Sequence, residues 1–275
     1  MRSFLVLAIS LIIGSSAIAE DTSNIRPSMP MEMCAAHVPY GVPKSARLDT
    51  TSICRQGYAL EHDNKAKIPA WVAYTLTPDH AVGCYPRVGT FKMDPSIHPE
   101  TSARAKDYAK SGYDIGHMAN DGDMRWDPQV ELESNVFSNG APQLPGLNRG
   151  GWRMLEDQTR AWATQRQHDL LIYVGPVYEK KAPSTIGANA VTLPLSFFKI
   201  IIDQQTNEIL IFVYPHQETS APPSTFQTSL AVAQNLTQIV FPIPMRPIFS
   251  PGLWPSSTKS ARSEKSRTCI LDQKP

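Results

Sequence analysis

The sequence predicts an α+β domain with a mainly antiparallel central sheet flanked by helices. Short apolar segments typical of strands lie on both sides of a helical middle part, and they rarely alternate with helices in the βαβ pattern of a parallel sheet. Hydrophobic residues make up 41% of the 275 residues, which is enough for a substantial core. We therefore expect one large domain.

The N-terminal residues 1–19 have the features of a secretory signal peptide. Arg2 precedes an apolar run over residues 4–13, and small residues lead to Ala19 at the expected cleavage site. An apolar run of about ten residues is too short for a membrane-spanning helix, which needs roughly 20. We predict an exported protein, periplasmic or extracellular, with no membrane anchor after signal cleavage.

The four cysteines indicate disulfides, because their number is even and the chain is expected to be exported. Three pairings are open. Pairing of Cys34 with Cys54 and of Cys84 with Cys269 is favoured, since the first bridge closes a short local loop. Residues 20–254 are assigned to the domain, and residues 255–275 to a flexible tail that Cys269 would hold.

Strands are expected on both sides of the middle part because short apolar runs end there at turn signals. The second early run ends at Thr77-Pro78-Asp79, and the last two late runs form a hairpin around residues 204–208. The predicted strands cover residues 57–60, 70–76, 170–177, 190–194, 197–203 and 209–214.

The longest predicted helix covers residues 147–164. Trp152, Leu155, Thr159 and Trp162 recur at helical spacing and form one buried stripe, so both tryptophans are assigned to the core. A second, weaker helix is predicted over residues 225–238.

Polar residues suited to phosphodiester hydrolysis surround the long helix. His117 lies in a strand-like segment, Asn148 opens the helix, and Glu156 and Arg160 follow along one flank. A histidine can take a proton from water near neutral pH. Magnesium binds oxygen ligands and keeps several waters, which a nearby carboxylate can hold, while an arginine can bind the phosphate.

Each of these residues also has a simpler structural explanation. A histidine is often structural, Asn148 could only cap the helix, and Glu156 with Arg160 could form an ordinary exposed ion pair. Removing Arg2 from 26 basic residues leaves 25 against 25 acidic ones, so bulk charge does not indicate nucleic-acid binding. The combination and spacing of the residues favour the catalytic interpretation.

Three motifs contain these residues. They are Asp-Ile-Gly-His at residues 114–117, Asn-Gly-Ala-Pro-Gln at 139–143, and Leu-Asn-Arg-Gly-Gly-Trp-Arg-Met-Leu-Glu at 147–156. From about Cys34 to Pro244 the chain resembles the DNA/RNA non-specific endonucleases of the ββα-metal type, relatives of endonuclease G. The resemblance implies a ββα-metal core within residues 20–254, DNA and RNA as substrates, Mg²⁺ or Mn²⁺ as cofactor, and 5′-phosphate products.

The resemblance also implies a role for each residue. His117 would activate water, Asn148 would bind the metal directly, and Glu156 would order metal-bound water. Arg160 would contact the substrate phosphate, and Asn139 would help to hold the loop and the scissile group.

One position departs from the family pattern. The arginine between the aspartate and the glycine of the first motif is Ile115 here, which removes a cation beside the reacting phosphate. Arg149, Arg153 and Arg87 are candidates to replace this charge, and Arg149 and Arg87 are also predicted to bind substrate.

Two other functions stay open. The chain could be a nuclease fold that lost turnover through Ile115 and binds nucleic acid or a protein partner, or a phosphodiesterase for small substrates. A purely structural role is disfavoured, because it would not need this polar set around one helix. The sequence leaves open the preference between DNA and RNA, the formation of a homodimer, and the biological role.

Overall fold

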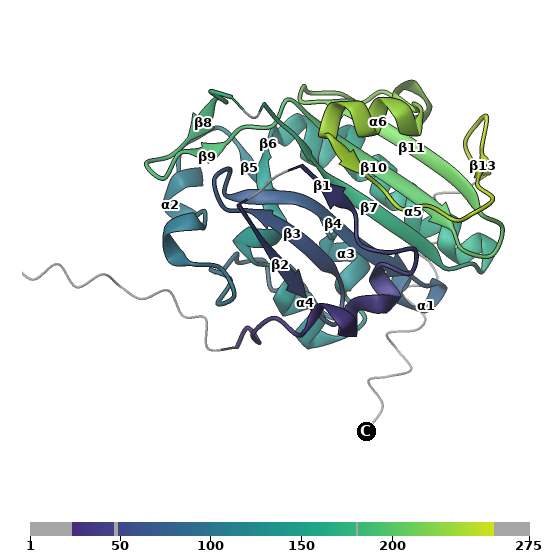
Figure 1. Ribbon diagram of the computed structural model, residues 1–275, viewed down its shortest axis with the longest axis horizontal. Coiled ribbons are helices and arrows are strands. Elements are labelled where there is room, and N and C mark those ends of the chain that lie inside the picture. Colours follow the sequence, from purple (N-terminus) through teal and green to yellow (C-terminus); the bar gives the residue numbers. More distant parts are fainter. Residues whose placement is uncertain (1–23, 47–48, 180, 256–275) are drawn as a thin grey trace, which may run out of the picture.

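The computed structural model describes residues 24–46, 49–179 and 181–255 (Figure 1). The predicted signal peptide, Cys269 and the tail beyond residue 255 lie outside the described residues. Within the described ranges, no helix has both the length and the apolar character needed to cross a membrane.

A seven-stranded sheet forms the centre of the molecule (Figure 1). Its order is β13-β11-β10-β7-β4-β3-β2, and each neighbouring pair is antiparallel except β11 with β13. The predicted α+β class with a mainly antiparallel sheet is confirmed. The strands are β2 (Thr50–Cys54), β3 (Ala59–Asp63), β4 (Ile68–Leu76), β7 (Leu170–Val177), β10 (Ser196–Asp203), β11 (Glu208–Pro215) and β13 (Ile248–Phe249).

The central strand β7 is apolar along its whole length because both faces of the sheet are covered. On β7, Ile172 and Val174 belong to the core under the helix α5 (Trp152–Arg166), whereas Leu171 and Tyr173 belong to a second core under α6 (Leu230–Thr237). Side chains of a strand alternate between faces, so a strand buried on both sides shows a continuous apolar run.

The helix α5 lies against the sheet through the predicted stripe. Trp152, Leu155, Thr159 and Trp162 are all fully buried. A π-helical turn, η4 (Leu147–Gly151), precedes α5 and contains non-helical backbone at Gly150. This kink separates Asn148 and Arg149 from the regular helix.

A two-stranded hairpin beside α5 completes a ββα unit. The strands β5 (Asp114–His117) and β6 (Gly140–Gln143) are antiparallel, with His117 opposite Gly140. Gln143 lies over Gly116, where an added Cβ would meet the Gln143 Oε1 atom at 2.1 Å. The motif at residues 114–117 therefore packs against the motif at residues 139–143, because only a glycine at position 116 leaves room for the side chain of Gln143.

Some predicted elements differ from those observed. The second helix is divided into η5 (Pro223–Phe226) and α6, because Ser229 caps a new helix by accepting from the Val232 N–H. The predicted strand 190–194 shortens to β9 (Val191–Thr192), which pairs with β8 (Thr185–Ile186) outside the main sheet. The strand β2 was not predicted.

The remaining elements are η1 (Met31–His37), β1 (Lys44–Ser45), α1 (Pro78–Ala81), η2 (Pro99–Thr101), α2 (Ala105–Tyr108), α3 (Asp121–Met124), α4 (Pro128–Ser134), η3 (Phe137–Asn139) and β12 (Ile239–Val240).

A disulfide between Cys34 and Cys54 joins η1 to β2, with a Cα–Cα distance of 5.7 Å. This confirms the favoured local pairing. Cys84 is also disulfide-bonded, and its predicted partner, Cys269, lies outside the described residues.

Removing the Cys34–Cys54 bridge is expected to lower the free energy of unfolding by about 2–4 kcal/mol, because the bridge restricts the unfolded chain. The Cys34→Ala/Cys54→Ala variant should unfold at a lower urea concentration than the wild type. The nuclease assay at low temperature is the control, since neither cysteine lies near the candidate site. An unchanged unfolding free energy would contradict this expectation.

Candidate active site

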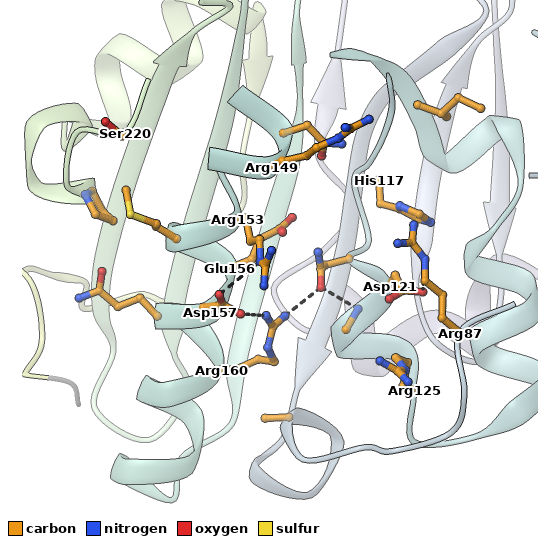
Figure 2. A pocket seen from close by; sticks show the side chains of 18 of the residues that line it. Arg87, His117, Asp121, Arg125, Arg149, Arg153, Glu156, Asp157, Arg160 and Ser220 are labelled. Atoms are coloured by element: carbon orange, nitrogen blue, oxygen red, sulfur yellow. Dashed lines mark hydrogen bonds and ion pairs between the residues drawn. The ribbon is translucent and has the colours of Figure 1, made fainter. Parts of the chain in front are cut away.

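An open pocket of ≈ 960 Å³ lies between the β5–β6 hairpin and α5. Figure 2 shows His117, Asp121 and Arg87 on one side, and Arg153 and Glu156 on the α5 side. Five arginines line this pocket, so positive charge is concentrated there although the whole chain is nearly neutral. They are Arg87, Arg125, Arg149, Arg153 and Arg160.

His117, at the end of β5, is only 7% exposed. Its Nε2 atom lies 3.1 Å from the Oδ1 atom of Asn135, and the ring of Phe91 lies beside it at 4.5 Å between centroids. Burial lowers the pKa of His117 to about 4. The imidazole is therefore neutral at pH 7 and is able to accept a proton.

Asn148 enters the pocket from the η4 turn. Its Nδ2 atom donates to Asp114 Oδ2 at 3.0 Å, which sets the amide orientation and makes Oδ1 the atom that can bind a cation. The N-cap position of α5 is Gly151. Asn148 is therefore not the N-cap of α5, because the kink at Gly150 places it before the regular helix.

Glu156 and Arg160 lie in a buried polar group on the α5 side of the pocket. Glu156 is 6% exposed, and burial raises its pKa to about 7. Arg160 donates to Asp123 at 2.7 Å and also pairs with Asp157. These contacts replace the exposed Glu156–Arg160 pair that the spacing alone would suggest.

The arginines at the rim are each held near a carboxylate and stay largely exposed. Arg149 pairs with both oxygens of Asp114, at 2.8 and 2.5 Å. Arg87 lies 3.4 Å from Asp121. A guanidinium has five N–H donors, so one bidentate pair leaves donors for a phosphate.

Asn139 does not line the pocket. Its Oδ1 atom accepts from the Ala119 N–H at 2.8 Å, and its Nδ2 atom donates to the backbone oxygens of Ala119 and Ser134. The side chain is fully buried. In the structure it therefore joins the loop after His117 to the end of α4 through backbone groups that occupy its amide, and a contact with the scissile group stays a prediction.

Three residues of the site were missed by the sequence analysis. Asn135 contacts His117, Arg125 lines the pocket, and Lys199 is fully buried with its Nζ atom 5.0 Å from the Trp152 ring centre. Lys199 could have been identified from the sequence, because it lies inside the apolar strand run 197–203 and lysine is almost never fully buried unless it is paired. Asn135 and Arg125 carry no such signal.

The oxygen donors in the pocket fit magnesium. Among the described residues, no group of three or more His, Cys, Asp and Glu side chains is arranged to hold a metal. The oriented Oδ1 atom of Asn148 and the buried carboxylate of Glu156 line the same pocket. One neutral oxygen ligand with a nearby carboxylate suits a cation that retains most of its waters.

The hairpin, the kinked helix and the pocket between them define a ββα-metal nuclease core. Residues 36–244 match the DNA/RNA non-specific endonuclease family. The chain belongs to this family, and the resemblance inferred from the three motifs is confirmed.

The relatives of this chain include nucleases from distant organisms. Mitochondrial endonuclease G of Homo sapiens is 30% identical over 64% of this chain and 62% of its own length. The nuclease of Serratia marcescens is 29% identical over 71% of each protein. A crystal structure of an EndoG/EndoGI complex superposes with a TM-score of 0.69 at 29% identity, covering 78% of this chain and 92% of that one. The chain thus spans less than two thirds of the length of human endonuclease G.

Proposed function

We propose that this protein is an exported endonuclease that hydrolyses phosphodiester bonds of DNA and RNA with Mg²⁺ or Mn²⁺, leaving 5′-phosphate products. The observation that carries the proposal is the neutral, hydrogen-bonded imidazole of His117, which shares an arginine-lined pocket with Asn148 and Glu156. Membership of the non-specific endonuclease family supports the same activity.

In this proposal His117 takes a proton from a water molecule, whose oxygen attacks the phosphorus. The bond from phosphorus to the 3′ oxygen breaks, and this oxygen takes a proton from a water molecule, which gives a 5′-phosphate and a 3′-hydroxyl. Asn148 would hold the cation through Oδ1, and Glu156 would accept hydrogen bonds from the waters that the cation retains. A bound divalent cation would offset the negative charge that develops on the phosphate and the leaving oxygen.

The arginines would bind the substrate backbone from both sides of the pocket. Arg160, Arg149 and Arg87 are the proposed phosphate contacts. Contacts with phosphates carry no base sequence information, which agrees with a non-specific enzyme. The Cys34–Cys54 disulfide supports export, since such bonds persist in oxidising compartments.

The test is cleavage of supercoiled DNA and of RNA by the purified mature protein, with magnesium and with chelator. Loss of both polymers with magnesium and their survival with chelator is the expected result. Binding without cleavage would indicate the binding-module alternative. Hydrolysis of a chromogenic diester with intact polymers would indicate a small-substrate phosphodiesterase.

Arg149 is expected to replace the family arginine that is Ile115 here. Asp114, which directly precedes Ile115, holds Arg149, and Arg149 and Ile115 line the same pocket. Arg149→Ala should therefore lower turnover roughly tenfold, the scale of one solvent-screened charge-assisted contact. Initial rates on supercoiled DNA at saturating magnesium measure this effect.

The matched experiment adds Ile115→Arg to both backgrounds. It should change the wild-type rate little and should restore most of the rate lost in Arg149→Ala. A gain of about a hundredfold or more from Ile115→Arg in the wild type, near 2.7 kcal/mol, would contradict replacement by Arg149.

A further inference from the structure

The side chain of Lys199 lies inside the interface between the central sheet and α5. Phe197 and Ile201, two residues before and after it on β10, belong to the core under α5, so the alternation of side chains places Lys199 on the same face. Lys199 is fully buried, and within the described ranges its Nζ atom has no hydrogen-bond partner. A buried ammonium needs opposite charge nearby, because it has lost its contact with water.

The groups that act on Lys199 come from α5 and α3. Its Nζ atom lies 5.0 Å from the centre of the Trp152 ring, and the face of an indole attracts a cation. The carboxylates of Glu156 and Asp123 also attract it, whereas the guanidinium of Arg160 repels it. Burial lowers the pKa of Lys199, and the two carboxylates oppose this effect.

Asp123 already has close partners of its own. It accepts at 2.7 Å from the hydroxyl group of Tyr74 and at 2.7 Å from Arg160. Arg160 also pairs with Asp157, whose side chain is 42% exposed at the edge of the pocket (Figure 2). The positive charge of Arg160 is therefore shared with two carboxylates other than that of Glu156.

Glu156 lies beside these groups and depends most on the charge of Lys199. Burial raises the pKa of Glu156 to about 7, and Lys199 does more than Arg160 to oppose this effect. Asp123 raises the same pKa, and a hydrogen bond with Asn120 lowers it. Without Lys199, this buried group would hold an excess of negative charge, which Glu156 would remove by taking up a proton.

We propose that Lys199 is a positioning residue, whose buried ammonium keeps the Glu156 carboxylate charged at the pocket. A charged carboxylate accepts hydrogen bonds on both oxygens, whereas a protonated one donates from one of them. The inference rests on the proposed role of Glu156, which must accept from the waters of a bound cation. Lys199 lies outside the three motifs and does not line the pocket, so it acts through Glu156.

The critical variant is Lys199→Met, which keeps a long unbranched side chain and removes the charge. A nearby opposite charge typically lowers a carboxyl pKa by about 1–3 units, so its loss should raise the pKa of Glu156 by a similar amount. Because Glu156 acts in its ionised form, the lower pH limit of cleavage and of magnesium binding should rise with this pKa. From the wild-type value of about 7, a rise of one unit lowers the ionised fraction at pH 7 about fivefold.

The matched control is Ile201→Met on the same strand. Ile201 is fully buried on the same face of β10, so its replacement disturbs the packing under α5 without changing any charge. The pH profile of cleavage should match that of the wild type, even where the variant is less stable. A shift that occurs only in Lys199→Met then reports the loss of charge.

A double variant, Lys199→Met/Asp123→Asn, restores the charge balance. It removes one buried positive charge and one buried negative charge, and leaves Arg160 to offset Glu156. The lower pH limit should return toward the wild-type value, although Asp123→Asn weakens the bonds with Tyr74 and Arg160. A side chain that only fills space would show no such recovery, because a second buried substitution would add to the damage.

The direct readout is the infrared carbonyl band of the protonated Glu156 carboxyl group in metal-free protein, which is followed against pH and assigned with Glu156→Gln. The band should persist to higher pH in Lys199→Met than in the wild type. Folded Lys199→Met with the wild-type titration would overturn the inference. A loss of cleavage that is equal at every pH would overturn it as well.

Two further outcomes separate this inference from the proposed function. A wild-type Glu156 that stays protonated in mildly alkaline solution would overturn the inference, and this measurement needs no variant that might fail to fold. A shifted infrared titration in Lys199→Met with an unshifted pH profile of cleavage would support the link from Lys199 to Glu156. It would refute the role of Glu156 under Proposed function.

Discussion

His117→Ala is expected to lower the rate of DNA cleavage by about 10²- to 10⁴-fold, the range for a lost general base. The ring is neutral because burial lowers its pKa to about 4, so it can accept a proton throughout the neutral range. Removing it leaves the attacking water without a proton acceptor. Initial rates on supercoiled DNA at saturating magnesium measure this loss.

The control for His117→Ala is substrate and metal binding by the folded variant. Asn148, Glu156 and the arginines are unchanged, so binding of DNA and magnesium should stay close to that of the wild type. Added magnesium should not recover the lost rate. Cleavage near the wild-type rate would remove His117 from the mechanism.

Asn148→Ala is expected to weaken magnesium binding by at least about 100-fold. Loss of an outer-shell partner of a metal ligand typically costs 10- to 100-fold in affinity or activity, and loss of the direct ligand should cost no less. Calorimetric titration of the protein with magnesium measures the affinity, and the magnesium dependence of cleavage provides a second readout. In contrast to His117→Ala, the rate should recover partly at high magnesium.

Met154→Ala is the control for Asn148→Ala. Met154 lines the same pocket and is 36% exposed, but its side chain offers no oxygen ligand. Its replacement should leave the magnesium titration unchanged. A wild-type titration for Asn148→Ala would show that the amide oxygen does not bind the metal.

Patterns of apolar residues predicted helices and strands correctly where these residues recur regularly or form a continuous run. The stripe from Trp152 to Trp162 is fully buried, and the apolar run 170–177 is the strand β7 with the same limits. Both patterns arise from the distance between side chains along one element, which depends little on the remainder of the fold. The missed strand β2, with the sequence Thr-Thr-Ser-Ile-Cys, has no such period.

The sequence identified those site residues that lie in the motifs, but it did not predict conformations that depend on residues distant in the chain. His117, Asn148, Glu156 and Arg160 all line one pocket, as their motifs implied. The conformation of Asn148 was not predicted, because it depends on Asp114 from the hairpin and on the kink at Gly150.

The sequence by itself determined the family, the long helix, most strands of the main sheet, and the pocket residues His117, Asn148, Glu156 and Arg160. Only the tertiary structure decided which atoms of those residues face the pocket. Backbone groups occupy the amide of Asn139, and the Nε2 atom of His117 contacts Asn135, which lies 18 residues away in the chain. The physical reason is that hydrogen-bond direction depends on neighbours distant in the chain, whereas periodicity is a property of a single segment.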